Sequence, residues 1–171
     1  MSPKPSRTDE TLVISEPPRT DETSHLTPNP QSPPCPFCLP LNPARVIADL
    51  GDFTWLVGEH QFYPGYSVLV AKRHVREIFE LTPAERACLT EALARAAQAM
   101  QTAYAPRKLN YAALGNAVEH LHWHIIPRYP HDPQPLENPW ANVGEFGKHA
   151  TTDAGARQVA EKLRNAKPVG A

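Results

Sequence analysis

Three histidines occur at every second position within residues 119–129: His120, His122 and His124. On a β-strand, side chains two residues apart point to the same face and lie about 6.6 Å apart. The alternation therefore predicts a strand with a row of imidazoles on one face and apolar side chains on the other. On a helix the same spacing would scatter the three rings around the axis.

An imidazole row on one face of a strand has three chemical interpretations. It can bind a transition metal such as Zn²⁺, it can supply a nucleophile whose neighbours stabilise charge, or it can be buried for structure alone. The structural role is least favoured, because each buried ring would need its own polar partner. A metalloenzyme using all three histidines is disfavoured because the one nearby carboxylate, Glu119, is expected on the opposite face of the strand.

Two cysteines, Cys35 and Cys38, form a C-x₂-C pair, which is typical of metal or redox sites in a reducing compartment. Redox pairs of this spacing usually precede a helix, whereas Pro40 and Pro43 indicate a loop here. A metal bound by this pair needs two further ligands, and histidine is the commonest source. A pair without a special role stays open as an alternative. Cys88 is expected to be a small core residue.

The surrounding sequence predicts the elements that must position these residues. Strands are expected twice within residues 44–58, around a turn at Gly51-Asp52, and then at 66–72, 108–115 and 120–129. The clearest element is a helix that ends near residue 104 and begins after Thr82, with Glu85 completing a capping box. This order predicts an α+β fold, with an antiparallel five-stranded sheet and one long helix packed on it.

The two ends of the chain differ from its centre. Eight of the 20 prolines precede residue 35, so residues 1–33 are expected to be a disordered Pro-rich tail. Residues 34–145 are expected to form the folded domain, and residues 146–171 a C-terminal extension with a helix over 153–166. Trp140 is expected to pack back over the site or the core.

Composition excludes some classes of partner. The formal net charge of −1 over 171 residues gives no strong field for nucleic acid or an anionic membrane. No apolar run is long enough to span a bilayer, and the N-terminus has no signal-peptide core. These features predict a cytoplasmic protein whose partners include neither a nucleic acid polymer nor a membrane.

The histidine row resembles the signature of the histidine triad (HIT) family, His-x-His-x-His followed by two apolar residues. The resemblance covers about residues 35–130 and rests on three segments. The CPFC start is similar to a zinc-containing bacterial branch, residues 55–85 are similar to the family's strand–loop–strand segment and helix start, and residues 109–129 are similar to a bacterial subgroup. The resemblance implies a HIT-like fold for residues 34–145.

The resemblance also implies a role for each histidine. His122 would attack the α-phosphorus of a nucleotide and form a nucleotidyl-histidine intermediate, which water or another acceptor then cleaves. His124 would donate hydrogen bonds to phosphate oxygens. The implied substrate-binding residues are Asn110, Gly115, Asn116 and His124. The implied ligands of a structural zinc ion are Cys35, Cys38, His74 and His120.

The implied function is that of a nucleotide hydrolase or nucleotidyl transferase that pairs as a homodimer. Its substrate would be a dinucleoside polyphosphate or a nucleoside monophosphate conjugate, and hydrolysis, phosphorolysis and transfer share the first half-reaction. The alternative is a non-catalytic nucleotide-binding or zinc-stabilised interaction module. Ala117, Gly58 and Tyr66 depart from the family's usual hydroxyl, polar and histidine residues, which affects the substrate contacts. Arg128 is interpreted either as a phosphate partner or as half of a surface ion pair.

Overall fold

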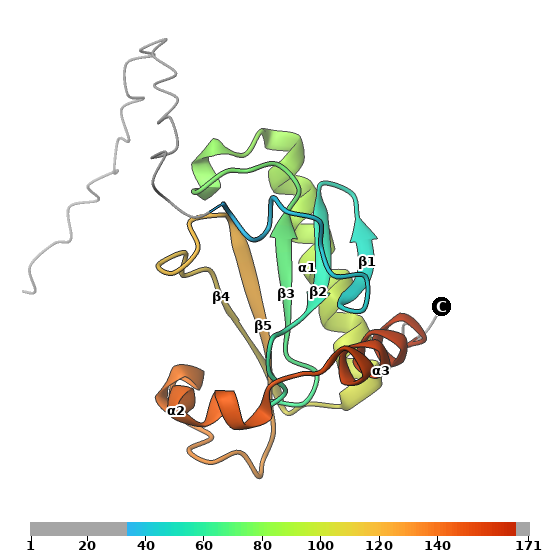
Figure 1. Cartoon of the computed structure of the whole chain (residues 1–171), viewed down its shortest axis with the longest axis vertical. Helices are drawn as coiled ribbons and strands as arrows, with labels where there is room; N and C mark the ends of the chain where they lie inside the picture. The colour runs from blue at the N-terminus through green and yellow to red at the C-terminus, as the bar shows by residue number, and fades with distance from the viewer. Residues whose placement is uncertain (1–33, 167–171) are drawn as a thin grey trace, which may run out of the picture. The chain divides into compact units, whose positions relative to one another are not determined.

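The computed structural model describes residues 34–166, so the predicted disordered tail, residues 1–33, lies outside the described residues. Five strands form one antiparallel sheet in the order β1-β2-β3-β5-β4 (Figure 1). The strands are β1 (Val46–Leu50), β2 (Phe53–Val57), β3 (Ser67–Ala71), β4 (Lys108–Ala112) and β5 (His122–Arg128). The predicted α+β fold with an antiparallel five-stranded sheet is confirmed.

The long helix α1 (Pro83–Tyr104) begins where the sequence predicts. The Thr82 hydroxyl accepts the N–H of Glu85 at 3.2 Å, and the Glu85 carboxylate accepts the N–H of Thr82 at 2.7 Å. This capping box satisfies two N–H groups that have no partner inside the helix. The helix ends at Ala105, which has a left-handed φ of 46°.

One face of the sheet is closed by helices. Trp55, Leu69 and Ile125 pack in a core with the buried stripe of α1. Helix α3 (Asp153–Arg164) adds Ala160 and Leu163 to the same core and lies beside the end of α1 in Figure 1. The residues after 145 therefore contribute to the hydrophobic core, although the predicted division of the chain into domains stays a prediction.

The other face of the sheet has a thinner cover and carries the histidines. Val68 and Val70 of β3 and Ile126 of β5 form a second apolar cluster on this face. The cluster is covered by side chains from the segment before β1 and from the segment after β5. That later segment contains the short helices η2 (Pro139–Asn142), α2 (Val143–Phe146) and η3 (Gly147–His149).

Strand β5 begins two residues later than the alternation predicts, so His120 does not belong to it. The main chain of Leu121 instead hydrogen-bonds to the last residue of β3 and to a residue beyond it: its carbonyl accepts from Ala71, and its N–H donates to the carbonyl of Val75. This departure turns the His120 ring away from the row. Among residues 34–166, no helix is long and apolar enough to cross a membrane.

Candidate active site and metal centre

His122 opens β5 on the face of the sheet that α1 does not cover. Its Nδ1 lies 2.6 Å from the main-chain carbonyl oxygen of His120. A carbonyl oxygen only accepts hydrogen bonds, so Nδ1 carries the proton and Nε2 keeps an unshared electron pair. The residue lines a cavity of about 490 Å³ together with Gly115 and Asn116, two of the predicted substrate-binding residues. The ring is therefore a nucleophile candidate at the edge of a cavity.

The Nε2 atom of His122 is not sealed by packing, although the residue as a whole is only 8% exposed. Within the described part of the chain, the buried side-chain nitrogen and oxygen atoms without a partner are His60 Nδ1 and Thr151 Oγ1. Nε2 of His122 has no hydrogen bond to another described residue and is not in that set, so it retains contact with solvent. The ring of Phe37 packs 5.1 Å from the imidazole and fixes its orientation.

His124 lies two residues further along the strand, with its ring 4.8 Å from that of His122. Its Nδ1 is 2.7 Å from the hydroxyl of Tyr66, and the indole of Trp140 packs against it in an edge contact at 5.1 Å. Burial lowers the pKa of His124 to about 4, and the charges that His122 and His60 would carry act in the same direction. His124 is therefore neutral at physiological pH beside the candidate nucleophile.

His120 is fully buried, and its ring lies with Cys35, Cys38 and His74, whereas the rings of His122 and His124 contact each other. Its Nε2 lies 2.6 Å from the carbonyl oxygen of Ala71, so this nitrogen carries the proton. The Nδ1 lone pair then faces Cys35 and Cys38, whose sulfurs lie 3.4 Å and 3.6 Å away. A second hydrogen bond that fixes the tautomer in this way is typical of a metal-ligating histidine.

Four side chains converge at this point: Cys35, Cys38, His74 and His120, with their ligand atoms within 4.8 Å of one another. In a tetrahedral zinc site, Zn–S of about 2.3 Å and Zn–N of about 2.0 Å place sulfur and nitrogen about 3.5 Å apart. Three of the four sulfur–nitrogen distances are 3.2, 3.4 and 3.6 Å, and the fourth, between Cys35 and His74, is within 4.8 Å. The four predicted ligands therefore fit a closed zinc site.

The electrostatics of the cluster agree with a cation. Burial is the main cause of the raised pKa of Cys38, and the neighbouring Cys35 raises it further. Two adjacent thiolates are therefore unfavourable here unless a positive ion lies between them. The presence of two histidine nitrogens favours metal binding over a redox disulfide. Cys88 lies apart from the cluster and donates to the carbonyl of Leu50.

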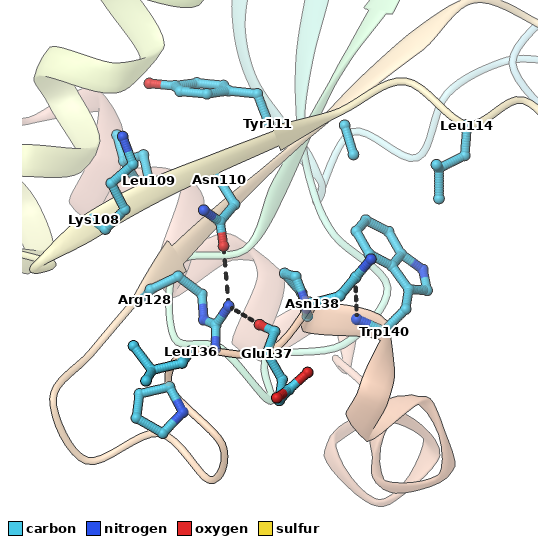
Figure 2. Close-up of a pocket in the computed structure, with 13 residues that line it drawn as sticks. Lys108, Leu109, Asn110, Tyr111, Leu114, Arg128, Leu136, Glu137, Asn138 and Trp140 are labelled. Carbon is cyan, nitrogen blue, oxygen red and sulfur yellow. Dashed lines mark hydrogen bonds between the residues drawn. The ribbon is translucent and has the colours of Figure 1, made fainter.

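Asn110, the remaining predicted substrate-binding residue, lines a second cavity of about 730 Å³ on the same face of the sheet (Figure 2). Leu114 lines both this cavity and the one at His122. The structure therefore places Gly115 and Asn116 beside His122. Asn110 lines the neighbouring cavity, whose walls include β4 and Trp140. Gly115 has a left-handed φ of 69°, which explains a glycine at this position.

Comparison with known families places these features in context. The HIT domain matches residues 40–131, more than half of the chain. The chain belongs to the HIT family. Cys35 and Cys38 precede the matched residues, so half of the metal cluster lies outside them. No curated protein sequence matches the chain.

Solved structures of HIT proteins have the same fold. A histidine triad protein from Sinorhizobium meliloti is 30% identical, with a TM-score of 0.63, and the match covers 72% of this chain and 89% of that one. A histidine triad protein from Bradyrhizobium japonicum is also 30% identical, with a TM-score of 0.61 over 71% and 88% of the two chains. A diadenosine triphosphate hydrolase from Plasmodium falciparum, 16% identical, shares the fold with a TM-score of 0.59 over 72% and 76%.

Arg128 in this HIT protein forms an ion pair, but the pair is buried, so the expected surface location is wrong. The residue lines the second cavity, and its role as a phosphate partner stays a prediction. Its side chain is 6% exposed and pairs with Asp132 at 2.9 Å. It also donates to the carbonyl of Gln134. Figure 2 shows its two further hydrogen bonds, to the carbonyl of Glu137 and to Oδ1 of Asn110. The arginine links the segment after β5 to the sheet. Among residues 34–166 the N–H₂ group of Asn110 has no side-chain hydrogen bond, so it can face a ligand.

Two residues at the HIT site were not identified from sequence. Phe37, between the two cysteines, packs on both His120 and His122 and so links the metal cluster to the nucleophile candidate. Arg76 lines the cavity of His122 and forms an exposed ion pair with Glu119 at 3.0 Å. Arg76 lies two residues after the candidate zinc ligand His74, and this position could have indicated that it is near the site. Nothing in the local sequence indicated the role of Phe37.

Proposed function

We propose that this HIT protein is a nucleotide hydrolase or nucleotidyl transferase. Its substrate would be a dinucleoside polyphosphate or a nucleoside monophosphate joined to a small group, cleaved at the α-phosphate. The observation that carries the proposal is the tautomer of His122. Its Nδ1–H is committed to the carbonyl of His120, so the unshared pair of Nε2 faces a solvent-accessible cavity.

In the proposed first step, Nε2 of His122 attacks the α-phosphorus and the bond from phosphorus to the leaving group breaks. The leaving atom takes the electron pair and acquires a proton from water. Phosphorylation of Nε2 makes the ring cationic, and the carbonyl of His120 then accepts a stronger hydrogen bond from Nδ1–H. This contact therefore stabilises the intermediate more than the free enzyme, which is the requirement for catalysis.

In the second step, a water oxygen attacks the same phosphorus and the P–N bond returns its electron pair to Nε2. The proton that this water loses neutralises the hydroxide left by the first step, and the products are the nucleoside monophosphate and the free enzyme. A covalent intermediate divides one difficult displacement into two easier ones. The ring of His124, neutral and 4.8 Å from His122, supports the phosphate oxygens as a hydrogen-bond donor.

Substrate contacts follow from the two cavities. Gly115 and Asn116 border the cavity of His122, where the main-chain N–H groups of their loop can bind phosphate oxygens. Asn110, held by Arg128, presents its amide N–H₂ to the second cavity. We assign the first cavity to the reacting phosphate and the second to a more distant part of the substrate.

The metal cluster has a structural role in this proposal. Cys35, Cys38, His74 and His120 would hold a zinc ion, which has no open coordination position when four protein ligands surround it and so strengthens the fold. The cluster joins the segment before β1 to the residue whose carbonyl orients His122. A cytoplasmic location, as the cysteines predict, would keep both thiols reduced and available.

The experiment that tests this function follows the covalent adduct. A diadenosine polyphosphate labelled at an α-phosphate is mixed with enzyme and quenched in alkali, in which a phosphoramidate survives. Wild-type protein is expected to carry label on a histidine within the first turnover, and His122→Ala to bind nucleoside monophosphate without label or turnover. His131→Ala, which removes an exposed ring stacked on Tyr129, serves as the matched control.

Two outcomes would contradict the proposal. If His122→Ala cleaves the substrate as fast as wild type, the nucleophile is assigned incorrectly. If wild-type protein binds nucleoside monophosphate tightly but forms no adduct with any member of a substrate panel, the non-catalytic nucleotide-binding alternative replaces it.

We also propose that the protein pairs as a homodimer through β4, in line with the family expectation. Strand β4 lies at one edge of the sheet, and Tyr111 and Leu114 beside it are 46% and 48% exposed. An unpaired edge with exposed apolar residues is suited to pairing with a second copy. Tyr111→Lys is expected to halve the mass measured by analytical ultracentrifugation, whereas Phe79→Lys, at an exposed aromatic residue on η1 (Ile78–Glu80), is expected to leave it unchanged.

A further inference from the structure

Tyr66 makes a contact with the active site that the proposed reaction does not yet use. Its hydroxyl lies 2.7 Å from Nδ1 of His124, and its ring is parallel to the imidazole within 13°. The residue is 8% exposed, and the ring of His60 stacks on it at 4.5 Å. Packing therefore holds the phenol in one orientation.

The position of this ring depends on a glycine. A Cβ atom at Gly58 would lie 2.3 Å from the ring of Tyr66, far inside van der Waals contact. The two residues are neighbours through a main-chain hydrogen bond of 3.0 Å from the N–H of Gly58 to the carbonyl of Tyr66. The absence of a side chain at residue 58 thus provides the space through which the phenol reaches His124.

The direction of the hydrogen bond follows from the chemistry of the two groups. Within residues 34–166, Nδ1 of His124 is the acceptor that the structure gives to the Tyr66 hydroxyl. If the imidazole donated instead, the phenol proton would lose this acceptor in a buried position, which is costly. Burial also raises the pKa of Tyr66 well above its usual value, so the hydroxyl keeps its proton and donates it.

A hydrogen bond donated to Nδ1 determines the state of the other ring nitrogen. A neutral imidazole has one N–H, and it must be on Nε2 when Nδ1 accepts. Nε2 has no protein partner among the described residues and belongs to a ring 4.8 Å from that of His122. The donor therefore lies next to the place where phosphate would react.

We propose that Tyr66 is a positioning residue that holds His124 as the neutral Nε2–H tautomer, so that His124 can donate to the phosphate during transfer. The inference rests on the proposed function for its catalytic meaning, although the tautomer itself is a property of the free protein.

The test replaces one oxygen atom. Tyr66→Phe removes the hydroxyl and keeps the ring, and Tyr129→Phe is the matched control. Tyr129 is also 8% exposed, and its hydroxyl donates to the carbonyl of Pro64; its ring stacks on His131, which lies outside the row of His120, His122 and His124. Both variants lose one buried tyrosine hydrogen bond, so both should lose similar stability in a thermal unfolding experiment.

The decisive measurement is the ¹⁵N NMR spectrum of histidine-labelled full-length protein near pH 7, with His124→Gln used to assign the signals. Wild type and Tyr129→Phe are expected to show His124 with an unprotonated Nδ1 and a protonated Nε2. Tyr66→Phe is expected to show a mixture of the two tautomers, and adduct formation is expected to slow about tenfold, the effect of one hydrogen bond.

The outcomes separate this inference from the proposed function. If Tyr66→Phe keeps the wild-type tautomer, or forms the adduct within twofold of the control, the role of Tyr66 is refuted while His122 can still be the nucleophile. If His122→Ala retains turnover, the proposed function fails, and the NMR spectra still decide whether Tyr66 sets the tautomer.

Discussion

The buried pair of Arg128 and Asp132 allows a quantitative prediction about stability and function together. The two side chains are 6% and 5% exposed, and their nitrogen and oxygen atoms are 2.9 Å apart. Arg128→Met keeps the volume of the side chain but removes the guanidinium. The carboxylate of Asp132 then stays buried with the N–H of Tyr129 as its remaining donor, and the carbonyls of Gln134 and Glu137 lose a partner.

Removal of one partner from a buried ion pair costs about 3–5 kcal/mol, because the other charge is left without compensation. We expect Arg128→Met to lower the free energy of unfolding by about 3 kcal/mol, near the low end of this range, since Tyr129 still donates to Asp132. Asp132→Asn leaves the guanidinium with three acceptors and is expected to cost about 2 kcal/mol. The double variant removes both charges, so its loss is expected to be smaller than the sum by about 2 kcal/mol.

The assay is urea unfolding of the four proteins, followed by tryptophan fluorescence and circular dichroism at constant zinc concentration. Coincident transitions would justify a two-state free energy. Additive losses, or a loss below 1 kcal/mol for Arg128→Met, would refute the reasoning that the two charges compensate each other in a buried site. Because Arg128 also orients Asn110, the same variant is expected to raise KM more than it lowers kcat.

Three further predictions concern the metal cluster, the histidines and the glycine beneath the phenol. Metal analysis of wild-type protein purified without chelator is expected to find about one zinc per chain. Cys38→Ser is expected to lose this zinc and to have a lower Tm, whereas Cys88→Ser is expected to keep it. The pKa of His124 is about 4 in the folded protein and 6.5 in the unfolded chain, so the unfolded state takes up the proton first as the pH falls. The free energy of unfolding is therefore expected to decrease as the pH is lowered from about 6.5 to about 4. His124→Gln should flatten this part of the plot of unfolding free energy against pH. Gly58→Ala is expected to destabilise the protein by about 1–3 kcal/mol and to slow adduct formation, because the new methyl group displaces the ring of Tyr66 that hydrogen-bonds to His124. A Cβ at Gly144 meets no atom within 4 Å, so the control Gly144→Ala is expected to have neither effect.

The features that sequence predicted well are those set by neighbouring residues. The capping box of Thr82 and Glu85 is a contact across three residues, so its spacing alone identifies the start of α1. The alternation of His122, Trp123 and His124 assigns the faces of β5 in the same way, because side-chain direction on a strand depends only on sequence position. The C-x₂-C spacing likewise indicated a metal site before its histidine ligands were brought together.

The features that sequence could not predict depend on contacts between distant residues. Nothing near His120 in sequence indicates that it leaves the strand, because Val75 and Ala71 supply the hydrogen bonds that redirect it. The burial of Arg128 has a similar origin, since its acceptors include Asn110 on a neighbouring strand and carbonyls in the following loop.

The sequence by itself predicted the strands, the long helix and the set of residues with reactive side chains, since these follow from local spacing and periodicity, and its resemblance to the HIT family indicated the family. The tertiary structure decided the protonation pattern of those residues. His124 and Tyr66 are 58 positions apart, and only the register of β3 against β5, together with the space left by Gly58, brings the phenol within hydrogen-bond distance of the ring. Tautomers depend on which donor or acceptor each nitrogen meets, and folding alone determines those partners.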